Sequence, residues 1–209
     1  MGHEGSSFCL KRCCRAAGVT AGLGVIALWT LSMTLGAARR TERRGLPVLR
    51  LHQPRVVVLK SKRRLYLFEG DRLTRSYPVA LGRHPSGDKC SLGDGRTPEG
   101  VFRICARKRH SEHHRFLGID YPNADAARAG FEAGLLTAGE ARAILEATEA
   151  GRCPPWTTAL GGGIGLHGGN GASRHAGRDW TAGCVALSDV AIEELFAVLR
   201  LGDVVEILP

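Results

Sequence analysis

RVVVLKSKRRLYLFE (residues 55–69) is the stretch that decides the fold class. Residues 55–60 and 65–69 are β-branched, aliphatic and aromatic runs separated by a short polar break, a pattern that predicts a β-hairpin. Further strand signals follow at 73–81, where Pro78 favours an edge position or a bulge, and at 101–106 and 204–208. Residues 82–100 between them are rich in Gly, Pro, Asp and Ser and predict a long loop. A mainly β domain is expected.

Two helices are expected within this domain. The first covers 137–150, where Thr137 and Glu140 have capping-box spacing and Gly151 can end the helix. The second covers 189–201, which has apolar residues at helical spacing after Ser188, a suitable N-cap residue. Residues 107–131 give mixed signals.

The N-terminal segment predicts export. Residues 16–38 carry no charge, and about 20 apolar residues suffice to span a bilayer. We expect a basic tail (1–15), a transmembrane anchor or signal peptide (16–38), a linker (39–54) and one domain (55–209). An anchor is favoured because the run is longer than a usual signal core, although small residues at 36–38 could be cleaved. Either reading places the domain in the cell envelope, on the periplasmic or another extracytoplasmic side.

The net charge of +9 does not predict nucleic-acid binding. Eight basic and two acidic residues lie in residues 1–50, so most of the excess flanks the apolar segment. The remainder is mildly basic and does not interleave aromatic residues with Arg and Lys as base-stacking surfaces do. The expected partner is therefore a membrane, which the chain would contact through residues 16–38.

The seven cysteines do not form paired CxxC motifs, so a structural zinc site is not expected. Three precede the apolar segment, and four follow it (Cys90, Cys105, Cys153 and Cys184). One disulfide among Cys90, Cys105 and Cys153 would suit an oxidising envelope, and the sequence leaves the pairing open.

The residues most suited to chemistry lie in GGGIGLHGGNGASRHAGRDWTAGCVALSD (161–189). A cysteine nucleophile needs a base or a positive neighbour, and His167 could serve Cys184 as either. Gly183 would permit a sharp turn or close substrate approach. A helix beginning at 189 would bring free N–H groups near the thiol, favouring a thiolate and an oxyanion site. The alternative is a small buried cysteine and a core histidine.

Other polar residues are weaker candidates. His110, His113 and His114 could ligate a metal, but no matching set supports them, so an exposed basic loop is favoured. We expect no metal and no organic cofactor. His175 is read as a loop residue that could line the site. Asp179 could orient a neighbour, and Trp180 could pack against the site.

The segment resembles the catalytic motif of the L,D-transpeptidase (YkuD-like) family. The matching residues are His167-Gly168 and, after a Gly-rich stretch, Thr181-Ala182-Gly183-Cys184. GDGRTPEGVF (93–102) is similar to the family's TPxG element. FLGIDYPNADAARAG (116–130) is similar to its YPN element. The resemblance covers roughly residues 55–209.

This resemblance implies an L,D-transpeptidase-like β-sandwich that acts on peptidoglycan stem peptides. It implies that Cys184 attacks the carbonyl before D-Ala, that His167 is the base, and that a backbone carbonyl at Thr181 completes the catalytic set. Gly183 would shape the turn or the oxyanion site, while Gly168, His175 and Trp180 would bind substrate. The resulting thioester would pass to an amine, giving cell-wall crosslinking or remodelling, or to water.

Two positions depart from the family pattern. Ala186 stands where many members have Arg or Asn, and Ala182 stands where many have His. The form DWTAGCVAL is similar to a branch that includes an amidase releasing a lipoprotein from peptidoglycan. The alternatives are therefore a peptidoglycan hydrolase of the same mechanism, with an envelope lipoprotein as a further candidate partner, and a non-catalytic peptidoglycan-binding module. A cysteine hydrolase acting on proteins fits the upstream motifs less well.

Overall fold

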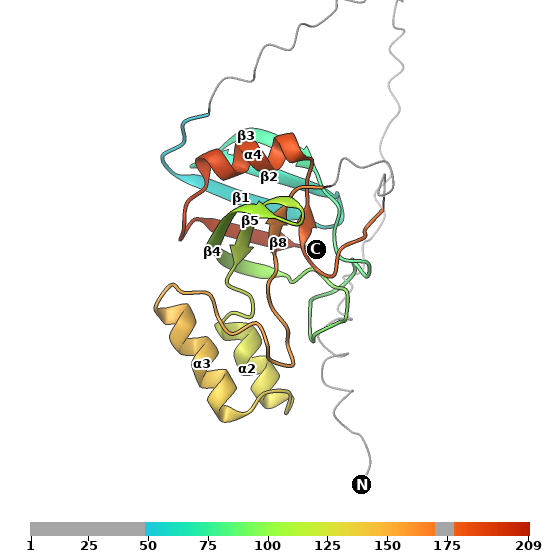
Figure 1. Cartoon of the computed structure of the whole chain (residues 1–209), viewed down its shortest axis with the longest axis vertical. Helices are drawn as coiled ribbons and strands as arrows, with labels where there is room; N and C mark the ends of the chain where they lie inside the picture. The colour runs from blue at the N-terminus through green and yellow to red at the C-terminus, as the bar shows by residue number, and fades with distance from the viewer. Residues whose placement is uncertain (1–48, 170–177) are drawn as a thin grey trace, which may run out of the picture.

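The computed structural model describes residues 49–169 and 178–209. Within these residues the chain forms eight strands and three helices (Figure 1). The strands are β1 (Pro54–Leu59), β2 (Arg64–Glu69), β3 (Arg72–Pro78), β4 (Gly100–Ser111), β5 (His114–Ile119), β6 (Gly165–His167), β7 (Val185–Ala186) and β8 (Val204–Leu208). The helices are α2 (Ala124–Glu132), α3 (Ala138–Glu149) and α4 (Asp189–Val198).

The strands form one curled sheet in the order β3-β2-β1-β8-β4-β5-β6-β7. The β1–β8 and β6–β7 pairs are parallel, and the others are antiparallel. Just beyond β3, Ala80 exchanges two backbone hydrogen bonds with Ala186 of β7, at 2.9 and 2.8 Å. This bridge joins the two ends of the sheet at one point.

The main core lies inside this curl. Alternate strand residues point inward, such as Val56 and Val58 of β1 and Leu65 and Leu67 of β2, and each is fully buried. Helix α4 adds Ile192 and Leu195 to the same cluster. The Tyr77 hydroxyl of β3 donates to the Glu194 carboxylate at 2.7 Å, so α4 is also fixed to the sheet by a polar contact.

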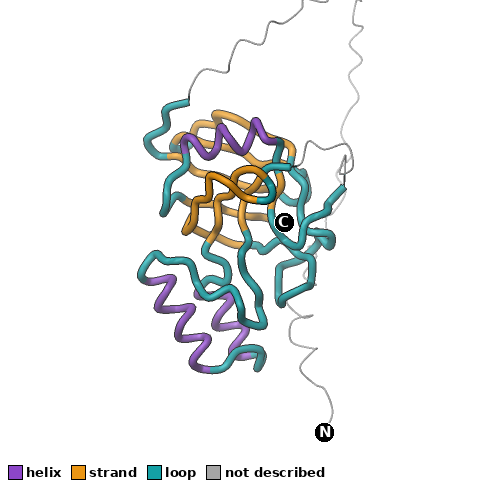
Figure 2. The backbone as a smooth tube through the Cα atoms, in the orientation of Figure 1, coloured by secondary structure: helices purple, strands orange, loops and turns teal. Residues whose placement is uncertain are grey.

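Helices α2 and α3 form a separate layer at one end of the sheet (Figure 2). Asn123 caps α2 by accepting from the N–H of Ala126, and Thr137 and Glu140 form the capping box of α3. A small apolar cluster joins the two helices to the segment before β6 through Ala127, Ile144 and Leu160.

The expected mainly β fold is confirmed. The hairpin of β1 and β2, strand β8, and helices α3 and α4 lie where the sequence predicts them. The expected sandwich is one sheet curled on itself rather than two separate sheets. The region of mixed signals at 107–131 contains the end of β4, strand β5 and the additional helix α2.

The domain begins a few residues before the expected boundary at 55. Leu49 and Leu51 pack against the core, and the N–H groups of His52 and Gln53 donate to the Glu69 carboxylate. The predicted tail, the anchor or signal segment and most of the linker lie outside the described residues. Within residues 49–169 and 178–209, no helix has the length and apolar character that crossing a bilayer requires.

Candidate active site

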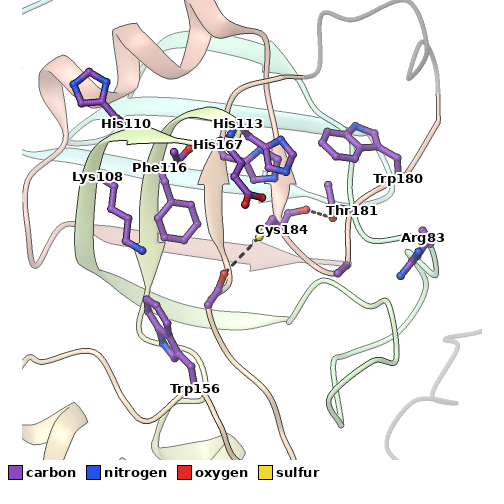
Figure 3. Close-up of a pocket in the computed structure, with 14 residues that line it drawn as sticks. Arg83, Lys108, His110, His113, Phe116, Trp156, His167, Trp180, Thr181 and Cys184 are labelled. Carbon is purple, nitrogen blue, oxygen red and sulfur yellow. Dashed lines mark hydrogen bonds between the residues drawn. The ribbon is translucent and has the colours of Figure 1, made fainter.

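Strands β6 and β7 bring Cys184 and His167 to one face. Their parallel register pairs Leu166 with Val185 and His167 with Ala186. Because side chains alternate between the two faces of a strand, Cys184, two residues before Ala186, lies on the face that carries His167. Both side chains line one pocket of about 590 Å³, where Figure 3 shows them next to each other.

The His167 imidazole is neutral and its tautomer is defined. Its Nδ1 lies 2.7 Å from the carbonyl oxygen of Gly168, which can only accept, so Nδ1 carries the proton. Nε2 is then left with a lone pair. Burial lowers the pKa of His167 to about 4; the nearby His113 lowers it too, and the Gly168 bond opposes the shift. At neutral pH this ring can accept a proton.

Aromatic packing fixes the plane of this ring. The His113 ring stacks on it, with centroids 4.6 Å apart, and Trp180 meets it edge-on at 5.6 Å. The carbonyl of His113 also accepts from the N–H of Gly168 at 2.9 Å. The turn between β4 and β5 therefore holds both the base and Gly168, the residue whose carbonyl sets its tautomer.

Cys184 is a partly buried thiol and the free cysteine among the described residues. Its Sγ lies 3.7 Å from the carbonyl of Gly163. Burial raises the pKa of Cys184, while the N–H of Gly165 and the charge of Lys89 act in the opposite direction. The thiol therefore rests protonated.

The helix terminus does not supply the thiolate-stabilising field expected from sequence. Strand β7 and two further residues separate Cys184 from α4, and the Ser188 side chain accepts from the N–H of Ala191. Asp189 at the start of α4 instead accepts from the N–H of Gly169 at 2.8 Å. The helix start thereby holds Gly169, two residues after the base.

Thr181 shapes the turn that carries the thiol. Its hydroxyl donates to the carbonyl of Cys184 at 2.7 Å and accepts from the N–H of Gly183 at 3.1 Å. Gly183 has φ of +143°, and a Cβ there would lie 2.7 Å from the carbonyl oxygen of Arg96. Gly183 thus supplies the expected turn, but its N–H is directed at Thr181 and not at an oxyanion site.

The carbonyl that His167 contacts is not the one expected at Thr181. The Thr181 carbonyl accepts from the N–H of Arg83 at 3.0 Å, whereas the carbonyl bonded to His167 belongs to Gly168. Gly168 was expected to bind substrate. Sequence reasoning missed its role because an (i, i+1) contact between a ring and a carbonyl depends on the backbone conformation at that residue.

Two walls flank the thiol (Figure 3). Lys108, Phe116 and Trp156 lie on one side of Cys184, while Arg83 and Trp180 lie on the other. Asp179 anchors the second wall, accepting from the N–H of Leu81 and from the Arg63 guanidinium. The sequence singled out Trp180 and Asp179 but not the first wall. The sequence signal that could have identified the first wall is strand alternation, which puts Lys108 and His110 on the same face of β4.

A disulfide braces the first wall. Cys105 of β4 is bonded to Cys153 in the loop after α3, with Cα atoms 5.1 Å apart. This is one of the pairings that the sequence left open. Trp156 lies three residues after Cys153, so the bond ties the Trp156 loop to the strand that carries Lys108.

Metal binding finds no support in the described residues, which contain no group of three or more His, Cys, Asp or Glu side chains suited to an ion. His113 is stacked on His167, and His114 Nε2 lies 2.8 Å from the Glu193 carboxylate. His175 lies outside the described residues, so its expected place at the site stays a prediction.

The fold and this pocket together place a thiol and a neutral imidazole on one face of a curled β-sheet, the pairing that cysteine acyl-transfer enzymes use. Residues 53–207 match the family model described as the L,D-transpeptidase catalytic domain, YkuD. The chain therefore belongs to this family. A search of curated proteins finds no match to the chain.

Solved structures of similar fold include members of the same family. Bd1075 of Bdellovibrio bacteriovorus is 20% identical over 76% of this chain and 48% of that chain, with a TM-score of 0.49. The L,D-transpeptidase from Mycobacterium smegmatis is 12% identical over 75% and 59%, with a TM-score of 0.44. The helical cell shape determining protein Pgp2 from Campylobacter jejuni is 20% identical over 74% and 47%, with a TM-score of 0.48. The chain spans about half the length of these proteins.

Proposed function

We propose that this protein is an L,D-transpeptidase that remodels or crosslinks peptidoglycan stem peptides through a Cys184 thioester. The observation that carries the proposal is the neutral His167, whose Nε2 is free to accept a proton on the face that bears the Cys184 thiol. Family membership supports the choice of stem peptides as substrate.

The protonation states suggest the order of proton transfers. As Cys184 Sγ attacks the carbonyl before the terminal D-Ala, His167 Nε2 takes the thiol proton. Because burial lowers the pKa of His167 to about 4, the imidazolium is a strong acid and returns this proton to the departing amine of D-Ala. The C–N bond breaks and a thioester remains. An acceptor amine then attacks the thioester carbonyl, or water does, and His167 takes a proton from the attacking group. The C–S bond breaks, and His167 returns this proton to Sγ, which restores the Cys184 thiol.

The decisive experiment follows the fate of a defined substrate. The full-length chain and its Cys184→Ala variant would each be incubated with a diaminopimelate-containing tetrapeptide muropeptide, with and without a free D-amino acid. We expect mass spectrometry to detect replacement of D-Ala only when Cys184 is present. The same masses from the Cys184→Ala sample would contradict the proposal.

A hydrolase of the same mechanism is the second candidate. Ala186 is fully buried and is the register partner of His167. The Arg or Asn side chain that many family members have at this position is therefore missing beside the base. Loss of D-Ala or of a crosslink with water added, and no exchange at any D-amino acid concentration, would favour this candidate. Release of a peptidoglycan-linked lipoprotein would identify that protein as the partner. Binding without turnover would favour the non-catalytic module.

We also propose that the domain works in the cell envelope, held or delivered by residues 16–38. The disulfide between Cys105 and Cys153 supports this because such bonds persist in oxidising compartments. In cells expressing the full chain, an impermeant protease added after outer-layer removal should degrade the domain. Protection equal to that of a cytoplasmic marker would overturn the proposal.

A further inference from the structure

We propose that Lys108 forms a subsite that binds one carboxylate of the peptide substrate. This inference rests on the proposed function, because it assumes a stem-peptide ligand. Its basis is the wall formed by Lys108, Phe116 and Trp156 beside Cys184, which we call the cationic wall (Figure 3).

The Lys108 ammonium is held between two aromatic rings. Its Nζ lies 5.8 Å from the centroid of the Phe116 ring and 5.9 Å from that of the Trp156 ring. Each ring face attracts the positive charge and limits the positions of the flexible side chain. Lys108 is solvent-exposed, but these two contacts favour its position at the pocket, so the entropic cost of ordering this side chain is partly met before a ligand arrives.

The charge of Lys108 is not neutralised within the described part of the chain, where the side chain forms no salt bridge. Glu112 lines the same pocket but is not within ion-pair distance of Lys108. An ammonium without a counter-ion, in the pocket that also contains the thiol, is complementary to a carboxylate. Of the carboxylates of a stem tetrapeptide, the two candidates are that of the terminal D-Ala and the α-carboxylate of the γ-linked D-Glu.

The rings themselves are firmly placed. A Cβ on Gly165 would lie 2.7 Å from the Phe116 ring, so that ring rests against the strand that ends in His167. Trp156 packs on Gly162, where a Cβ would lie 2.4 Å from the indole. The disulfide between Cys105 and Cys153 adds a covalent link to this wall. The rings that flank Lys108 are therefore held in place, although the lysine side chain itself is solvent-exposed.

Strand β4 offers a matched control. Arg107 stacks on Phe196 of α4, with its Cζ 4.4 Å from the ring centroid. Arg109 is solvent-exposed and is not among the residues that line the pocket. Lys108→Met and Arg109→Met thus remove the same charge from adjacent residues, only one of which faces the pocket.

The test measures binding in the full-length Cys184→Ala chain, so it does not depend on turnover. Calorimetry would compare this background with added Lys108→Met or Arg109→Met, using three forms of the tetrapeptide: unmodified, with a D-Ala carboxamide, and with D-isoglutamine. We expect Lys108→Met to weaken binding of the unmodified peptide about tenfold, as loss of a charge-assisted contact does. Arg109→Met should change the Kd less than twofold.

The amidated peptides identify the carboxylate. If Lys108 binds one of the two carboxylates, amidation of that carboxylate already removes the contact. Lys108→Met should then hardly change the Kd of that amidated peptide. It should weaken binding of the other amidated peptide about tenfold. Equal losses with all three peptides, no loss with any, or no binding of peptide to the background chain would each overturn the subsite. Binding that shows the expected pattern, in a chain that releases no D-Ala when Cys184 is present, would instead refute the transpeptidase proposal and leave the subsite standing.

Discussion

At the scale of the residue, the candidate site pairs a neutral Cys184 thiol with a neutral His167 imidazole and is not a preformed ion pair. Burial raises the pKa of Cys184 and lowers that of His167. Both shifts oppose charge separation, because each charged form would lose solvation inside the pocket. The thiol should therefore be activated during attack on the substrate, with Nε2 of His167 as the proton acceptor.

The first prediction concerns the pH dependence of thiol reactivity. Because the pKa of Cys184 is raised, its alkylation by iodoacetamide should still be increasing above pH 8.5, about the value of an ordinary thiol. The rate can be followed by mass spectrometry on the tryptic peptide 179–200, which contains Cys184 alone among the cysteines. A plateau near neutral pH would show a preformed thiolate and contradict the neutral pair.

The second prediction concerns the base. His167→Ala removes the proton acceptor, so Cys184 should be alkylated more slowly at pH 7 and turnover should be lost. His114→Ala is the control, since His114 contacts Glu193 and does not line the pocket. An unchanged alkylation rate in His167→Ala would argue against its role as base.

The third prediction concerns Thr181. Thr181→Val removes the hydroxyl that joins the N–H of Gly183 to the carbonyl of Cys184, leaving buried groups unpaired. We expect a loss of about 1–3 kcal/mol in unfolding free energy and a larger proportional loss of D-Ala release. Thr181→Ser should retain most of both. Chemical denaturation and product analysis on the full chain would measure them; equal behaviour of the Val and Ser variants would contradict this role.

At the scale of the element, the site depends on parts that are distant in sequence. The β4–β5 turn stacks His113 on the base, and the start of α4 holds Gly169 through Asp189. The long loop after α3 carries Trp156, and the disulfide between Cys105 and Cys153 joins this loop covalently to β4.

The fourth prediction therefore concerns this disulfide. Its residues are 48 apart in sequence, for which the chain-entropy model gives a stabilisation of about 4 kcal/mol. A Cys105→Ser, Cys153→Ser double variant should lose stability of this order in urea denaturation, and stem-peptide binding should weaken because Trp156 is less firmly placed. Wild type treated with a reductant should behave in the same way. A variant with unchanged midpoint and affinity would contradict the bracing role.

At the scale of the whole molecule, the buried His167 links stability to pH. Its folded-state pKa of about 4 lies below the unfolded value of 6.5, so the unfolded chain binds more protons between these values. Stability is thus highest above pH 6.5 and falls as the pH decreases towards 4. Asp94 titrates below this range because, against the opposing effect of burial, its bond to Lys89 lowers its pKa from the ordinary value.

The fifth prediction isolates the histidine. His167→Asn can keep a donor near the Gly168 carbonyl without titrating in this range, so its stability should fall less between pH 7 and pH 4. The difference between wild type and variant should be about 3 kcal/mol, from the shift in pKa. Denaturant titrations at both pH values would measure it, with Asp94 common to both proteins. Parallel pH profiles would contradict a buried neutral His167.

The sequence determined the elements whose signals are local. The β1–β2 hairpin follows from two apolar runs around a polar break, and α3 follows from the spacing of Thr137 and Glu140. Motif spacing likewise pointed to Cys184 and His167. Helix α2 escaped notice because it is short and its capping residue, Asn123, lies within a motif read for its family resemblance.

Only the tertiary structure decided how these pieces meet. The closing of the sheet by Ala80 and Ala186, the stacking of His113 on His167 and the pairing of Cys105 with Cys153 each join residues far apart in the chain. The same holds for the protonation states, since burial sets the pKa of a thiol or imidazole and a sequence pattern does not report burial at that depth. Local hydrogen bonding and side-chain periodicity act over a few residues and can be read from the sequence. Register, curl and desolvation arise when distant segments pack together, and they appear only in the folded chain.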